Sequence, residues 1–168
     1  MSSLDVLALE TLDATASGVV YRSLGGEPAF LAFDGHQTSG AGNGRYELIL
    51  DLPTDRPALT PESRWLFVVG VDLDAGHEAD FEDWYNVEHL PALATVPGVI
   101  RATRFRRAAT DETPGFPAYL ALYEIESPDI AGNPDWKDAV ETPWTQRVRQ
   151  HFQARWRGGY EREESADE

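Results

Sequence analysis

The side chains best suited to chemistry stand together within residues 80–91. His89 is the strongest candidate for a general acid or base, because an imidazole exchanges protons near neutral pH. Tyr85 precedes it by four residues and Glu88 by one. Residues four apart share one face of a helix, so Tyr85 could donate a hydrogen bond to a substrate oxygen beside His89. The stretch therefore predicts a proton-transfer site.

Each of these residues also has a structural interpretation. His89 could bond the carbonyl groups at a helix end, Tyr85 could lie at the edge of a core, and Glu88 could pair with an arginine of a neighbouring strand. If Glu88 is buried on the aromatic stripe, desolvation would raise the pKa of its carboxyl group and let it tune the imidazole. Trp84 is expected in the core or in a pocket wall.

A helix that ends near Pro91 is expected to carry this group. Asp80 can cap its first turn, and Pro91 lacks the backbone donor that an ordinary helix interior needs. His89 would then lie in the last turn or at a kink. At a helix end, the dipole and the nearby Glu82 and Glu88 favour a positive imidazole. The helix end thus predicts a histidine poised to give up or take a proton.

Two arginines of the strand expected at residues 99–107 are candidates for substrate binding. Arg101 and Arg104 are three positions apart, so they must point to opposite faces of the strand. At most one can reach a pocket, where it would hold a carboxylate or stabilise an enolate. The other is expected to offset the acidic surface.

The remaining histidines and the lack of cysteine argue against a metal. His77 stands near three aspartates, Asp72, Asp74 and Asp80, but no spacing such as His-x-x-x-His accompanies them. His151 falls on the apolar face of a second helix, as a core histidine or, alternatively, a haem ligand. The sequence predicts no metal and no cofactor.

The amino-acid composition indicates which classes of binding partner are unfavourable. The 168 residues are 42% hydrophobic, and 29 acidic against 14 basic residues give a net charge of −15. This charge disfavours nucleic acid and anionic membranes as partners, since both need a basic surface. No apolar run approaches the roughly 20 residues that span a bilayer, and no signal peptide is visible, so a cytoplasmic location is expected.

Short apolar runs predict strands at residues 18–22, 29–33, 45–50, 65–71, 99–107, 119–125 and 155–160, with a weak helix at 4–12 and a helix from 133 that restarts at 142. The order from residue 64 predicts an α+β fold, a ferredoxin-like βαββαβ unit over 64–160. Residues 1–60 are expected as a β-rich segment, with a degenerate half repeat as one interpretation. Residues 36–44 are expected as a loop, 52–63 as a linker and 161–168 as an acidic tail.

The strand at 65–71 is apolar on both faces, so the sheet face away from the helices needs cover. Two arrangements would supply it. A homodimer would pair two sheets face to face, whereas residues 18–50 could instead fold as a second half-barrel within one chain.

The run Trp84-Tyr85-Asn86-Val87-Glu88-His89-Leu90-Pro91, followed by Val-Pro-Gly-Val at 96–99, resembles the dimeric α/β-barrel superfamily, and within it the EthD-like branch. The resemblance covers about residues 64–160. It implies ferredoxin-like units paired sheet to sheet, a pocket between sheet and helices, and the family histidine at His89. Related branches include lactone isomerases, cofactor-free monooxygenases, polyketide cyclases, decarboxylases and haem-binding enzymes.

We therefore expect a small cofactor-independent enzyme that moves protons on a hydrophobic aromatic or cyclic small molecule. Isomerisation, cyclisation, decarboxylation and dehydration all fit. The expected catalytic residues are His89, Tyr85 and Glu88, and the expected substrate-binding residues are Trp84, Arg101 and Arg104. The alternative is a non-catalytic protein that binds a small ligand or haem in the same pocket.

Overall fold

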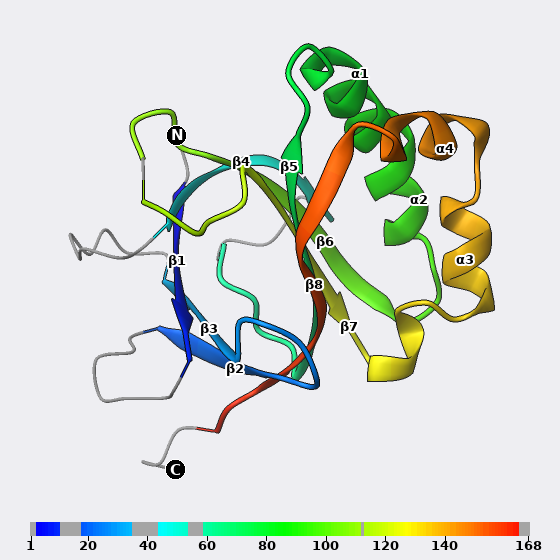
Figure 1. The fold of residues 1–168 in the computed structure, drawn as a ribbon. Helices are drawn as coiled ribbons and strands as arrows, with labels where there is room; N and C mark the ends of the chain where they lie inside the picture. The colour runs from blue at the N-terminus through cyan, green and yellow to red at the C-terminus, as the bar shows by residue number, and fades with distance from the viewer. Residues whose placement is uncertain (1–2, 11–17, 35–43, 54–58, 112, 165–168) are drawn as a thin grey trace.

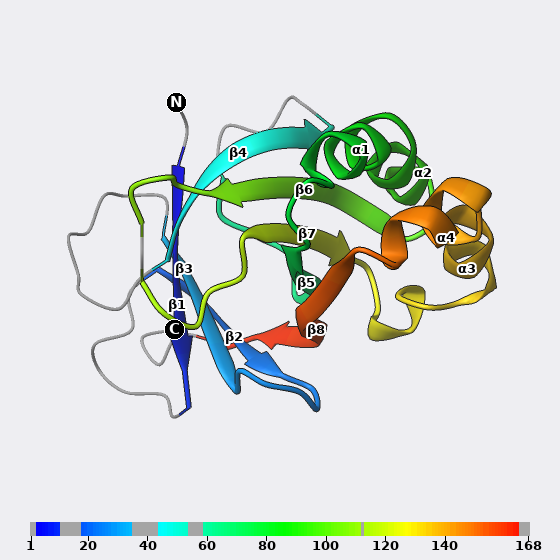
Figure 2. The same ribbon diagram turned by 45° about the horizontal axis from the view of Figure 1, so that its top comes forward.

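The strands close into one antiparallel barrel in the order β1-β3-β2-β8-β5-β7-β6-β4. The computed structural model describes residues 3–10, 18–34, 44–53, 59–111 and 113–164. The strands are β1 (Ser3–Leu9), β2 (Val19–Ser23), β3 (Phe30–Asp34), β4 (Gly44–Leu52), β5 (Trp65–Leu73), β6 (Val99–Arg107), β7 (Tyr119–Ile125) and β8 (Phe152–Arg162). Figures 1 and 2 show the helices on one side of this barrel, beside β5 to β8, and β1 to β3 on the other side.

The predicted fold class was wrong. Instead of a ferredoxin-like βαββαβ unit that pairs sheet to sheet, the chain forms a closed eight-stranded barrel with few helices. The element order after residue 64 was predicted correctly, but β4 pairs with β6 and β2 pairs with β8, so the N-terminal strands continue the same sheet. The chain's own strands thus cover the apolar face that had suggested a second copy. A homodimer stays a prediction.

The N-terminal helix expected at residues 4–12 was also wrong, because β1 occupies this region. Leu4 and Val6 are fully buried in the barrel interior, whereas Asp5 between them binds Arg45 of β4 (Arg45 Nε to Asp5 Oδ1, 3.0 Å). This alternation has the period of a strand, but a run of three residues was too short to establish it against a helical pattern.

Four predicted segments fall partly outside the described residues. These are 11–12 of the N-terminal helix, 36–43 of the glycine-rich loop, 54–58 of the linker and 165–168 of the acidic tail. Within the described part of the chain, no helix combines the length and the hydropathy needed to cross a membrane.

Successive residues of β5 serve two separate cores. Leu66 and Val68 point into the barrel with the side chains of β1 to β4, whereas Phe67 and Val71 point outward and pack beneath the helices. Because neighbouring side chains of a strand point to opposite faces, one apolar strand can build both clusters. This explains why the segment is apolar on both faces, as the sequence showed.

The first helical segment does not end before Pro91, contrary to expectation. It runs through α1 (Glu78–Asp83), a π-helix η1 (Trp84–His89) and α2 (Leu90–Ala94). The Leu90 N–H donates to the Tyr85 carbonyl five residues back, and Pro91 then stands at the start of α2. A proline is tolerated at a first helical position because that N–H needs no intrahelical acceptor. The π turn therefore absorbs the proline without ending the helix.

The second helical segment was predicted correctly as two pieces. It follows a short 3₁₀ helix, η2 (Pro128–Ile130), and consists of α3 (Pro134–Val140) and α4 (Pro143–Arg149). The Asn133 side chain accepts a hydrogen bond from the Trp136 N–H, and the Thr142 side chain accepts one from the Thr145 N–H. These caps, each followed by proline, set the two helix starts.

Candidate functional site

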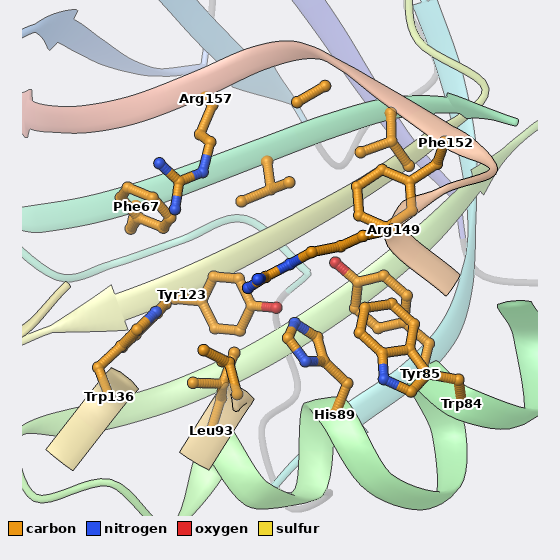
Figure 3. Close-up of a pocket in the computed structure, with 14 residues that line it drawn as sticks. Phe67, Trp84, Tyr85, His89, Leu93, Tyr123, Trp136, Arg149, Phe152 and Arg157 are labelled. Atoms are coloured by element: carbon orange, nitrogen blue, oxygen red, sulfur yellow. The ribbon is translucent and has the colours of Figure 1, made fainter. Parts of the chain in front are cut away.

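A cavity of about 370 Å³ lies between the helices and the outer face of β5, β7 and β8. Its size is within the range of small-molecule sites. Aromatic rings dominate the lining, namely Phe67, Trp84, Tyr85, Tyr123, Trp136 and Phe152. Figure 3 shows His89 reaching from the helix toward the middle of this cavity. The site is therefore shaped for a flat hydrophobic molecule with one imidazole beside it.

The π-helix brings the aromatic residues and His89 together. Trp84 and His89 stack with ring centroids 4.1 Å apart, and Tyr85 meets the imidazole edge-on at 5.0 Å. Residues five apart lie on different faces of an ordinary α-helix. The wider π turn places Trp84 beneath His89, and the Trp84 Nε1–H is held by Thr145 Oγ1 at 3.1 Å.

His89 is neutral in this environment. Burial, together with the positive charges of Arg149 and Arg104, lowers the pKa of its imidazole from 6.5 to about 3. The buried Nδ1 has no hydrogen-bond partner among the described residues. The expected positive imidazole was therefore wrong, since the ring is buried and its charged neighbours are arginines rather than carboxylates. A neutral imidazole can accept a proton from a ligand.

Two tyrosine hydroxyls stand beside the imidazole and stay protonated. Burial raises the pKa of Tyr85, and burial together with the neighbouring Tyr85 hydroxyl raises the pKa of Tyr123 well above 10. The Tyr123 hydroxyl is buried and meets no acceptor or donor at full hydrogen-bond geometry in the described part of the chain. Both groups can therefore donate to a ligand oxygen.

Of the six residues predicted for the site, Trp84, Tyr85 and His89 line the cavity. Glu88 instead accepts a hydrogen bond from Thr142 Oγ1 at 2.7 Å, outside the lining. Thr142 caps α4, so Glu88 anchors the start of that helix to η1.

The two predicted arginines do lie on opposite faces of β6, and neither lines the cavity. Arg104 donates to Glu82 and Asn86 and stacks over Tyr85 at 4.7 Å. Arg104 therefore packs against the Tyr85 ring without lining the cavity.

Arg101 belongs to a buried ionic cluster at the barrel. Its Nε and Nη2 donate to the two carboxylate oxygens of Asp51 at 2.8 and 2.9 Å, and its Nη1 lies 3.7 Å from Glu124 Oε2. Glu124 in turn accepts the Ser63 N–H at 2.9 Å. Arg101 thus links β4, β6 and β7, and its role is to hold these strands together rather than to bind a ligand in the cavity.

Sequence reasoning missed Tyr123, Arg149 and Arg157, which line the cavity. Tyr123 lies two residues after Ala121, and both belong to the outer core under the helices. The alternation of β7 therefore contained a signal for Tyr123. For the arginines, no such signal existed, because only the packing of α4 and β8 against the cavity assigns them to it.

His77 and His151 lie outside the cavity lining and stack on each other at 3.6 Å. Of the three aspartates near His77 in sequence, Asp72 pairs with Arg155 and Asp80 pairs with Arg147, whereas Asp74 Oδ2 lies 3.9 Å from His151 Nδ1. The described residues contain no group of three or more His, Asp or Glu side chains arranged to hold a metal ion.

The chain matches no known protein-family model and no curated protein sequence. Among solved structures, it is similar to a major regulator of staphylococcal pathogenesis, with 11% identity over 96% of this chain and 99% of that chain and a TM-score of 0.62. An anthrone oxidase-like protein matches with 14% identity over 97% and 91% of the two chains and a TM-score of 0.50. HapK from Hahella chejuensis matches with 16% identity over 61% and 95% and a TM-score of 0.42.

These likenesses concern the fold alone. At 11% to 16% identity, they do not assign this chain to a superfamily. The EthD-like branch is not confirmed. The comparisons therefore leave the chemistry to be argued from the cavity.

Proposed function

We propose that this protein binds a flat hydrophobic small molecule in the cavity and transfers a proton on it, with His89 as the base. The observation that carries the proposal is the neutral, buried imidazole, whose Nδ1 has no partner among the described residues. Protein interiors rarely leave such an atom unpaired without a reason. A ligand that occupies the aromatic cavity would bring a proton or a polar atom to this ring.

The simplest reaction is abstraction of an acidic C–H next to a carbonyl group. The C–H bond breaks, the proton passes to His89, and the electron pair moves onto the carbonyl oxygen as an enolate. The Tyr123 or Tyr85 hydroxyl donates a hydrogen bond to that oxygen, because both remain protonated. Return of the proton from His89 to another atom gives isomerisation. If the enolate instead expels a β-hydroxyl group that takes this proton from His89, water leaves and the result is dehydration.

The low pKa of His89 limits when the imidazole can accept a proton. In the empty cavity the imidazole holds a proton poorly, so a proton moves only when negative charge develops close to it. An enolate formed beside the ring meets this condition, because it offsets the positive charge of Arg149. The weak basicity of the empty site also favours a second candidate function, in which the protein binds the ligand without turning it over.

Exchange of a carbon-bound proton for deuterium separates the two functions without knowledge of the natural substrate. The probe is 2-tetralone, a bicyclic ketone with acidic C1 protons, followed by proton NMR in heavy water. Proton transfer predicts loss of the C1 signal at a rate proportional to protein concentration. Quenching of tryptophan fluorescence by 2-tetralone without any faster exchange would show binding alone and would contradict the catalytic proposal.

A further inference from the structure

The open side of the cavity is basic in a strongly acidic protein. Arg149 at the end of α4 and Arg157 of β8 are solvent-exposed lining residues, and no aspartate or glutamate is among the described residues that line the cavity. The chain as a whole has 29 acidic residues against 14 basic ones. The cavity lining therefore carries a local positive charge, whereas the protein as a whole is negative.

Both guanidinium groups are available to a ligand. Figure 3 shows them directed into the cavity from opposite sides of the lining, above Tyr123 and His89. Arg157 rests over the Phe67 ring at 5.4 Å, and the ion pairs found among the described residues do not include it. Arg149 has one weak partner, the exposed Glu141, at 3.4 Å.

We propose that the ligand of this cavity is an aromatic or cyclic anion, whose carboxylate or equivalent group is held by Arg149 and Arg157 while its rings occupy the aromatic interior. The inference rests on the proposed function, because it assigns a substrate class to the same cavity. A neutral ligand would gain at most an ordinary hydrogen bond from these two guanidinium groups, whereas a carboxylate matches their fork of donors and their charge. The protein's overall negative charge would repel such an anion, so only a local basic group can bind it.

Three probes that differ only in charge test the proposal, namely 2-naphthoate, neutral 2-naphthamide and cationic 2-naphthylmethylamine. Binding is measured by calorimetry on the full chain at neutral pH. We expect 2-naphthoate to bind at least about tenfold more tightly than 2-naphthamide, as for a charged group that gains a charge-assisted hydrogen bond. Equal or tighter binding of either other probe, or no binding of 2-naphthoate at millimolar concentration, would overturn the proposal.

A double variant, Arg149→Gln with Arg157→Gln, is expected to remove the preference for 2-naphthoate and leave 2-naphthamide binding unchanged. The matched control is Arg155→Gln, because Arg155 is exposed on the same strand and pairs with Asp72 outside the cavity. It should keep the preference. An unchanged preference in the double variant would also overturn the proposal. Because the experiment measures binding, its result does not depend on whether His89 transfers a proton.

Discussion

Replacing His89 by glutamine is expected to slow the exchange of the C1 protons of 2-tetralone by about 10²–10⁴-fold, the usual contribution of a general base. Glutamine keeps a polar side chain of similar reach but cannot take up a proton. Binding of 2-tetralone should change little, because the aromatic lining supplies most of the contact surface. The rate and the affinity are measured on the same protein sample by NMR and by fluorescence.

The matched control for this variant is His77→Gln. His77 precedes α1 and stacks on His151 outside the cavity lining, so its loss should leave the exchange rate unchanged. If both variants exchange protons at the wild-type rate, His89 is not the base. A thermal melt of each variant separates loss of chemistry from loss of folded protein.

Replacing Arg101 by methionine is expected to lower the free energy of unfolding by about 3–5 kcal/mol, the usual cost of breaking a buried ion pair. The variant leaves the carboxylates of Asp51 and Glu124 buried without their counter-charge. Removal of one partner destabilises the protein by more than the intact pair stabilises it, because the remaining carboxylates stay buried away from water and lose their ionic partner. Denaturant unfolding, followed by tryptophan fluorescence, measures the change.

Arg64→Met is the control, since the Arg64 side chain is 71% exposed and its pair with Glu161 is open to solvent. Its loss should cost no more than about 1 kcal/mol. A similar small cost for Arg101→Met would show that the buried cluster does not hold β4, β6 and β7 together. Failure of the Arg101 variant to fold, beside a well-folded Arg64 variant, agrees with the prediction.

Local patterns in the sequence predicted most of the elements but not how the strands close. The starts of α3 and α4 were predicted from Pro134 and Pro143 and the capping residues before them, because these signals act within one helical turn. The pairing of β4 with β6 joins residues about fifty positions apart, and no local pattern records it. The sequence therefore predicted a ferredoxin-like unit whose open sheet face would be covered either by a second copy or by residues 18–50.

The candidate site was predicted in part for the same reason. Trp84, Tyr85 and His89 lie on one short helical segment, so the sequence placed them near one another. The π turn that stacks Trp84 on His89 follows from tertiary packing and from Pro91, which had suggested a helix end. His89 was predicted to be positive but is neutral, because its burial and the nearby Arg149 and Arg104 follow from tertiary packing that the local sequence does not show.

The ionisation state of His89 tests the central claim most directly. Nitrogen-15 NMR of the imidazole, recorded from neutral pH downward, should show a neutral ring whose pKa lies far below 6.5, near the value of about 3 caused by burial and by Arg149. Addition of 2-naphthoate should raise this pKa, because a bound anion offsets the positive charge of Arg149. A pKa at or above 6.5 in the ligand-free protein would mean that the imidazole is exposed or paired with a carboxylate, and it would contradict His89 as a buried neutral base.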